Sequence, residues 1–172
     1  MSCINEKKVC KLITNSRTDV VNLFDDYIQW SNGYAFINFN YDHCTIISKL
    51  FKKGVLKNYK NITSSKNFDF EKLLEYGKEN EAEATQTPFM VTIGPHTYCI
   101  FKINGKYYFY DKELVDVFQH VEYKATSNIN NQNLYDLRVY NDNNLVGFIL
   151  PARDNHEGTQ DTLKELESQV GD

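Results

Sequence analysis

The chain has 172 residues, of which 41% are hydrophobic, as is typical of one soluble globular domain. The 19 Lys and Arg residues against 23 Asp and Glu residues give a net charge of -4, and the absence of a basic stripe disfavours a nucleic-acid partner. Apolar runs are too short to span a membrane, the first residues do not resemble a signal peptide, and four cysteines without CxxC spacing are expected to be reduced.

The first third of the chain is predicted to be mainly helical. Residues 1–15 form a lead-in whose apolar residues could make a short edge strand, and residues 18–28 have apolar residues at helical spacing. A turn at Ser31-Asn32-Gly33 separates this helix from a second, buried helix that begins near Ala35. Gly54, after two lysines, is predicted to cap that second helix at its C-terminus.

A loop and a short helix are predicted to follow. Residues 55–68 are polar and predicted to be loop, while the apolar spacing of residues 68–76 indicates a short helix that Gly77 closes. An acidic loop then carries Glu79, Glu81 and Glu83.

Beyond Pro88 the apolar pattern changes to the alternation typical of strands. Residues 89–93, 96–103 and 106–110 are predicted strands, with Asn104-Gly105 as a hairpin turn between the last two. Three further strands are predicted at 115–123, 134–140 and 145–150. Helices followed by antiparallel strands indicate an α+β domain over residues 1–152, and the polar residues 153–172 are predicted to be a flexible tail.

Four positions together suggest the frame of a cysteine protease. Such an enzyme needs a thiolate at a helix N-terminus, a general base, a group that orients the base, and oxyanion donors. Gln29 lies six residues before Ala35, at the start of the predicted buried helix, which would place Gln29 in the oxyanion hole and Ala35 in the nucleophile position. His96 and Asp111 lie at the two ends of one predicted hairpin, which brings base and orienter together. The thiol itself is missing.

Each of these residues also has a simpler interpretation. A histidine before a strand is usually structural or merely exposed, an aspartate that closes a strand is usually a turn residue, and a glutamine before a glycine turn usually has no special role. It is their joint spacing that favours the protease interpretation. Cys44, inside the predicted helix, and Cys99, on the His96 strand, are both interpreted as small core residues rather than as replacement nucleophiles.

The segment from His96 to Asp111, with its Asn-Gly turn and following aromatics, resembles the His-to-Asp hairpin of viral papain-like proteases, notably the aphthovirus leader proteases. Tyr34-Ala35-Phe36-Ile37-Asn38 is similar to their nucleophile motif, with Ala in place of Cys. The Tyr- and Asn-rich domain also looks like the papain-like proteases of nidoviruses, toroviruses in particular. The resemblance covers roughly residues 17–150 and implies a papain-like fold, with a central nucleophile helix packed on a C-terminal antiparallel sheet.

This resemblance implies a hydrolase of the host cytoplasm, monomeric and without cofactor or metal, that cleaves a viral polyprotein. It also implies removal of ubiquitin or of the interferon-induced ubiquitin-like modifier, an antagonism of innate immunity. Glu79, Glu81 and Glu83 could bind the arginine of the ubiquitin tail, with Gly94 and Pro95 beside the tail. Ala35 would make this chain an inactive variant, either engineered from Cys or natural.

Two other readings of the chain stay open. A naturally inactive domain of this kind could serve as a module that binds ubiquitin or a host protein. In an accessory structural domain, by contrast, Gln29, His96 and Asp111 would not converge on the Ala35 methyl group at all.

Overall fold

The structure is a computed structural model that describes residues 2–56, 75–153 and 157–170, and its fold is mixed α/β. The described residues form two antiparallel sheets, one of seven strands and one of three. The strands are β1 (Val20–Leu23), β2 (Tyr27–Ser31), β3 (Ala35–Asn40), β4 (Ala82–Glu83), β5 (Thr85–Ile93), β6 (His96–Ile103), β7 (Lys106–Asp111), β8 (Glu122–Ser127), β9 (Tyr135–Asn141) and β10 (Asn144–Ile149). The helices are α1 (Glu6–Asn15), α2 (Cys44–Lys53), α4 (Lys112–Val115), α5 (Glu157–Val170) and the 3-10 helix η1 (Lys78–Asn80).

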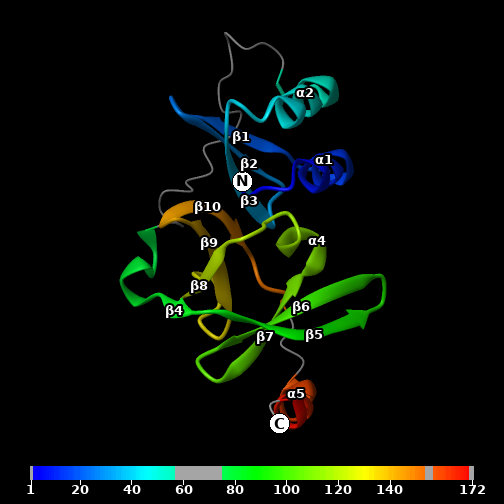
Figure 1. Ribbon diagram of the computed structural model, residues 1–172, viewed down its shortest axis with the longest axis vertical. Helices are drawn as coiled ribbons and strands as arrows, with labels where there is room; N and C mark the ends of the chain where they lie inside the picture. The colour runs from blue at the N-terminus through cyan, green and yellow to red at the C-terminus, as the bar shows by residue number, and fades with distance from the viewer. Residues whose placement is uncertain (1, 57–74, 154–156, 171–172) are drawn as a thin grey trace.

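The large sheet is built from two similar halves. Its strand order is β1-β2-β3-β10-β9-β8-β4, so the meander β1–β3 and the meander β8–β10 meet where β3 pairs with β10 (Figure 1). A helix comes before each meander in the chain, α1 before the first and α4 before the second. The order of elements is therefore repeated, a helix followed by three antiparallel strands, with the third strands joined at the centre.

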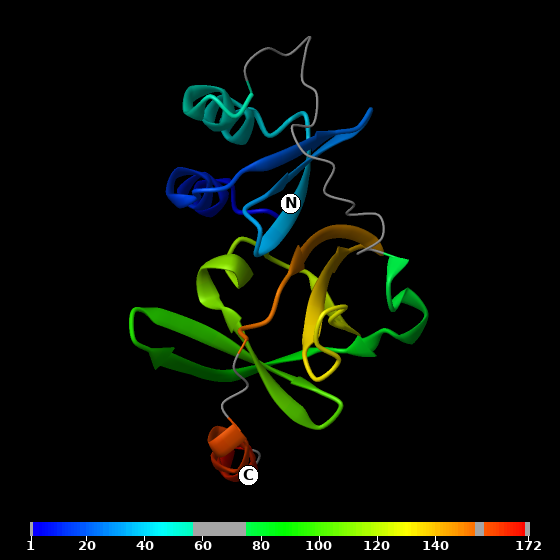
Figure 2. The ribbon, with the colours of Figure 1, turned by 180° about the vertical axis from the view of Figure 1, so that it is seen from behind.

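Helices α1 and α2 lie side by side against the β1–β3 end of this sheet, as Figures 1 and 2 show from opposite sides. Helix α1 is capped by Asn5, whose side chain accepts a hydrogen bond from the Lys8 backbone N–H. Val9 of α1 and Ile46 of α2 are buried with Trp30 of β2 in the main hydrophobic cluster. This packing is what holds the N-terminal helix beside α4 and the small sheet.

The predicted N-terminal helices are wrong. Residues 20–31 form the hairpin β1–β2, and residues 35–40 form β3, so Ala35 begins a strand rather than a helix. The β-branched and aromatic residues Ile28 and Trp30 lie two apart on β2 and bury their side chains on the same face of the sheet. A run of four to six apolar residues is compatible with a helix or a strand. In this region tertiary packing favours strands. Only the later part of the predicted second helix is helical, as α2.

Three other predictions differ from the structure. The predicted edge strand within residues 1–15 is helix α1, with Val9, Leu12 and Ile13 buried at helical spacing. Most of the predicted strand 115–123 lies between the end of α4 and β8. The tail predicted to be flexible contains the 14-residue helix α5, whose Leu163 is buried against the small sheet.

Other predictions are confirmed. Strand β6 spans the predicted residues 96–103, and the Asn104-Gly105 turn has the positive φ angles of a two-residue hairpin. Predicted strands 89–93, 106–110, 134–140 and 145–150 correspond to β5, β7, β9 and β10. Gly54 caps α2 in the left-handed conformation.

The predicted short helix at 68–76 lies mostly outside the described residues. None of the described helices combines the length and the apolar character that a membrane span requires.

Candidate functional site

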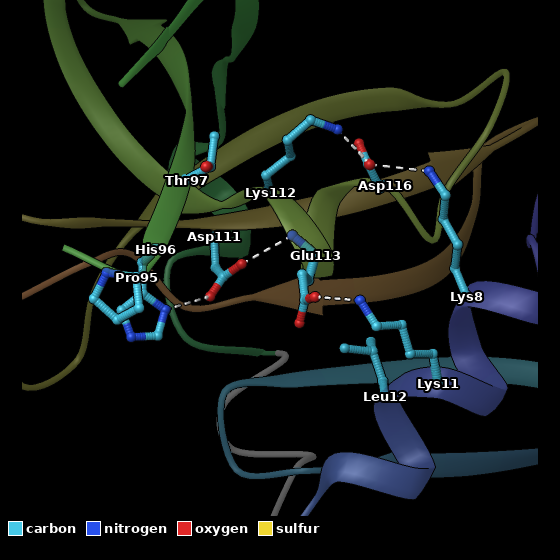
Figure 3. Close-up of a pocket in the computed structure, with 10 residues that line it drawn as sticks. All are labelled: Lys8, Lys11, Leu12, Pro95, His96, Thr97, Asp111, Lys112, Glu113 and Asp116. Atoms are coloured by element: carbon cyan, nitrogen blue, oxygen red, sulfur yellow. Dashed lines mark hydrogen bonds and ion pairs between the residues drawn. The ribbon is translucent and has the colours of Figure 1, made fainter. Parts of the chain in front are cut away.

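An open groove of about 460 Å³ lies between α1, α4 and the turn that joins β5 to β6 (Figure 3). It contains two of the residues singled out as catalytic, His96 and Asp111, and one of the two expected beside a substrate tail, Pro95. Its ten lining residues are Lys8, Lys11, Leu12, Pro95, His96, Thr97, Asp111, Lys112, Glu113 and Asp116. Most of them carry a charge or can gain one.

The charges in the groove are arranged as pairs that link α1 to α4. Asp116 accepts from Lys112, one turn before it, and from Lys8 of α1 at 2.9 Å, while Lys11 donates to Glu113 at 2.6 Å. Burial alone would raise the pKa of Asp116, but the hydrogen bonds from Lys112 and Lys8 outweigh burial and lower it. The cations and carboxylates of the groove are therefore paired with one another across α1 and α4.

His96 and Asp111 are neighbours, as the hairpin spacing predicted. The His96 Nδ1 atom is 3.8 Å from Asp111 Oδ2, which is an ion-pair distance but too long for a hydrogen bond. The His96 side chain is 59% exposed. The other carboxylate oxygen of Asp111 accepts from the Glu113 backbone N–H at 2.8 Å, which makes Asp111 the N-cap of α4. Asp111 thus has a structural role that is independent of His96.

Ala35 does not line the groove. It is 4% exposed, opens β3, and pairs with Ile149 of β10. Its backbone N–H donates to the side chain of Asn32, and its carbonyl accepts from the Ser31 hydroxyl. A thiol in place of its methyl group would lie in the hydrophobic cluster of the sheet, without the helix N-terminus that would favour a thiolate.

Gln29 also lies away from the groove, in a row of side-chain amides that crosses the large sheet. Asn22 donates to its carbonyl oxygen at 3.1 Å, and its amide donates to Asn38 at 3.0 Å. The Asn38 amide in turn donates to the Leu145 carbonyl of β10. Gln29 is 2% exposed, and its side chain is satisfied by these amides of β1 and β3.

The acidic residues expected to bind a substrate tail are separate from the groove. Glu79 lies on η1 and Glu83 on β4, and both are exposed. Glu81 between them accepts from the Tyr140 hydroxyl at 2.6 Å and lies 3.6 Å from Arg138 Nη1. Gly94 forms the β5–β6 turn with Pro95, at a φ of 59°, but does not line the groove.

Comparison of the chain with protein-family models, curated proteins and solved structures gives no match. The chemistry of the groove is therefore inferred from the side chains that line it. Among the described residues that line the groove, Thr97 is the only one with a hydroxyl, and none is a cysteine or a serine. The arrangement can bind charged groups of either sign and exchange a proton through His96, but it presents no activated nucleophile.

The four cysteines are free thiols, and none of them lines the groove. The interpretation of Cys44 as a core residue is wrong, because it is exposed at the first position of α2. Cys99, on the His96 strand, is buried, and burial followed by the negative charge of Asp116 raises its pKa. Burial likewise raises the pKa values of Cys3 and Cys10. Among the residues that the structure describes, no three His, Cys, Asp or Glu side chains are grouped as metal ligands.

Sequence reasoning did not find the charged residues that complete the groove. Lys8 and Lys11 were assigned to a lead-in rather than a helix, although Asn5 and the buried positions Val9, Leu12 and Ile13 have the pattern of a capped amphipathic helix. Asp111 followed by Glu113 is likewise the signature of a helix N-terminus, which would have placed Lys112 and Asp116 one turn apart beside His96.

Proposed function

We propose that this chain binds a protein partner through the groove around His96, and that the partner is ubiquitin or the interferon-induced ubiquitin-like modifier. The observation that carries the proposal is the presence of ion-paired charges of both signs in one open groove, whose described lining residues include no cysteine or serine. Free ubiquitin ends in Leu-Arg-Gly-Gly, so its tail brings one cation and a terminal carboxylate. A groove with both signs of charge complements such a tail.

Different elements would contact the two charges of the tail. Lys8 and Lys11 project into the groove from α1, where they can receive the terminal carboxylate. Asp111, at the end of β7, and Glu113 of α4 also line the groove and can receive the arginine. These contacts are partly exposed and must displace existing ion pairs, so we expect roughly micromolar affinity that weakens as salt is added.

A titration with a matched pair of variants tests this proposal. Labelled ubiquitin is titrated into the wild type, into Lys11→Glu and into Lys7→Glu. Both lysines are exposed on α1, but only Lys11 lines the groove. We expect Lys11→Glu to weaken binding about tenfold at low salt, since it reverses a contacting charge, and Lys7→Glu to leave it nearly unchanged.

Two results would contradict the proposal. One is the absence of saturable binding by either modifier at high micromolar protein. The other is an equal loss of affinity in both variants, which would indicate a general charge effect instead of binding in the groove. Ubiquitin that lacks its last two glycines serves as the ligand control and should bind more weakly.

Thiol proteolysis on a papain-like frame, in a virus-infected host cytoplasm, is the second proposal, and the proximity of His96 to Asp111 is what favours it. It predicts that Ala35→Cys gives thiol-dependent cleavage of a ubiquitin-tail fluorogenic substrate or of a viral polyprotein junction peptide. The binding proposal predicts no turnover, because position 35 is buried in β3 outside the groove. An Ala35→Cys, His96→Ala double variant is the control, since turnover that survives it does not use His96.

A further inference from the structure

The two edge strands of the three-stranded sheet, β5 and β7, differ in whether their outward backbone groups are hydrogen-bonded. On the outer edge of β7, the Tyr107 backbone N–H and carbonyl both bond to the side chain of Gln160 on α5. Further along that edge, the Ala152 N–H donates to the Phe109 carbonyl. The β7 edge is therefore covered by the segment that leads into α5 and by α5 itself.

The β5 edge is open between Met90 and Ile93. Ile93 pairs with His96 across the two-residue Gly94-Pro95 turn, so the backbones of these two residues bond to each other. Backbone groups of successive residues in a strand point to alternate sides, so the N–H and C=O groups of Met90 and Thr92 point outward, away from β6. No described residue donates to or accepts from these outward groups. The hairpin projects away from the rest of the molecule in both ribbon views, and the Met90 side chain is 58% exposed.

This edge also lacks the usual protection by charge. Residues 84–95 contain no Asp, Glu, Lys or Arg, although 24% of the chain is charged. Natural edge strands commonly carry charges or proline that discourage pairing with another strand. Here Pro88, beside the irregularity in the β5–β6 pairing, protects only the beginning of the strand.

We infer that β5 pairs with β5 of a second copy of this chain, antiparallel and about a two-fold axis at Val91. Each outward residue then meets its complement, since Met90 lies opposite the partner's Thr92 and exchanges both backbone hydrogen bonds with it. Four backbone hydrogen bonds join the copies. Pro88, at the irregularity in the β5–β6 pairing, has no N–H to donate, so the pairing ends before it.

The neutrality of the strand is what points to a second copy as its occupant. A two-fold axis at Val91 places this residue opposite its own copy and brings the residues beside it close to their own copies, so any charge there would lie near a like charge. In this dimer Val91 faces the partner's Val91, a favourable pair of β-branched residues. The partly buried side chains Phe89, Val91 and Tyr98 lie on the outer face of the small sheet, where the apolar surfaces of the two copies become continuous. The chain then forms a dimer with a six-stranded sheet, whereas its sequence was expected to give a monomer.

Disulfide trapping tests the register of this dimer. In a background with Cys3, Cys10 and Cys44 changed to Ser, Val91→Cys is compared with Thr92→Cys under mild oxidation. Directly opposed residues of a pair without mutual hydrogen bonds have Cα atoms about 4.5 Å apart, which suits a disulfide. The two copies of Thr92 are offset along the strands by more than a disulfide can bridge. We expect at least tenfold more cross-linked dimer from Val91→Cys on a non-reducing gel.

Sedimentation equilibrium of the untagged wild type supplies a readout that needs no cysteine. Dimer should form reversibly, and Val91→Lys, which places two ammonium groups at the axis, should weaken it at least tenfold. Three results would overturn the inference: equal cross-linking of both cysteine variants, a wild type that stays monomeric at several hundred micromolar, or unchanged association of Val91→Lys. If β5 binds an extended peptide instead of a second copy, the wild type would also stay monomeric in this experiment.

Discussion

The carboxyl group of Asp136 is buried on β9, where it accepts from the Asn128 amide at 2.6 Å. Burial raises its pKa to about 6, although the hydrogen bond from Asn128 and the charge of Arg138 act in the opposite direction. A carboxyl whose pKa is higher in the folded than in the unfolded state binds its proton more tightly when folded. Ionisation of Asp136 therefore opposes folding.

We predict that this single residue makes the protein less stable as pH rises from about 4 to about 6. Over this range the unfolded chain has released the Asp136 proton while the folded chain retains it, so the free energy of unfolding falls. Asp136→Asn removes this contribution, and its stability relative to wild type should increase with pH by up to about 3 kcal/mol. Urea unfolding at several pH values measures the difference. Asp161→Asn, at an exposed carboxyl on α5, should show no such trend.

Residue spacing in the sequence predicted one pair at the candidate site and misplaced another. His96 and Asp111 meet because an Asn-Gly hairpin fixes which residues lie at its two ends, and that information is local. The interval from Gln29 to Ala35 fits a turn into a helix as well as a strand hairpin. The long-range pairing of β3 with β10, which no local pattern reveals, favours the strand hairpin.

At the scale of elements, the packing of β10 requires a glycine at position 147. The Phe118 ring, which follows α4, packs directly over Gly147, and a Cβ atom added there would lie 2.1 Å from the ring. The β9–β10 register shifts between Leu145 and Gly147. Close approach of an aromatic ring, rather than an unusual φ angle, is therefore what requires glycine at this point of the strand.

We predict that Gly147→Ala lowers the free energy of unfolding by about 1–3 kcal/mol, because Phe118 must move out of a packed core. Phe118→Leu provides space, so the double variant should be less destabilised than the sum of the two single changes. Chemical denaturation of the four proteins gives the coupling. Strict additivity would show that the ring adjusts freely and that the contact does not constrain β10.

An element could be predicted where the sequence pattern that marks it is local. Strands β6, β7, β9 and β10 have six or more residues, are rich in aromatic and β-branched residues and lie beside turns, so their signal is distinct. Strands β1 and β2 have four and five residues, too few to distinguish a strand from a helix. Helix α5 was missed because its apolar stripe is weak and its position depends on bonds to Lys102 and Tyr107 of the small sheet.

At the scale of the whole molecule, the two helix-and-meander halves are joined by the seam between β3 and β10. Across this seam Phe36 stacks on Phe148, with ring centroids 5.4 Å apart. The seam is also spanned by the Asn38 side chain, which donates to the Leu145 carbonyl, 107 residues away in the sequence. Neither half has a complete sheet until the other is present.

This seam has a consequence for synthesis on the ribosome. At about 5–20 residues per second, β10 leaves the ribosome roughly 5–20 s after β3. During that interval the nascent chain has a finished N-terminal hairpin whose β3 edge, with Phe36 and Ile37, has no strand to pair with. Newly made chains therefore pass through an obligatory state with an exposed apolar edge, where chaperones can bind and where neighbouring nascent chains can associate.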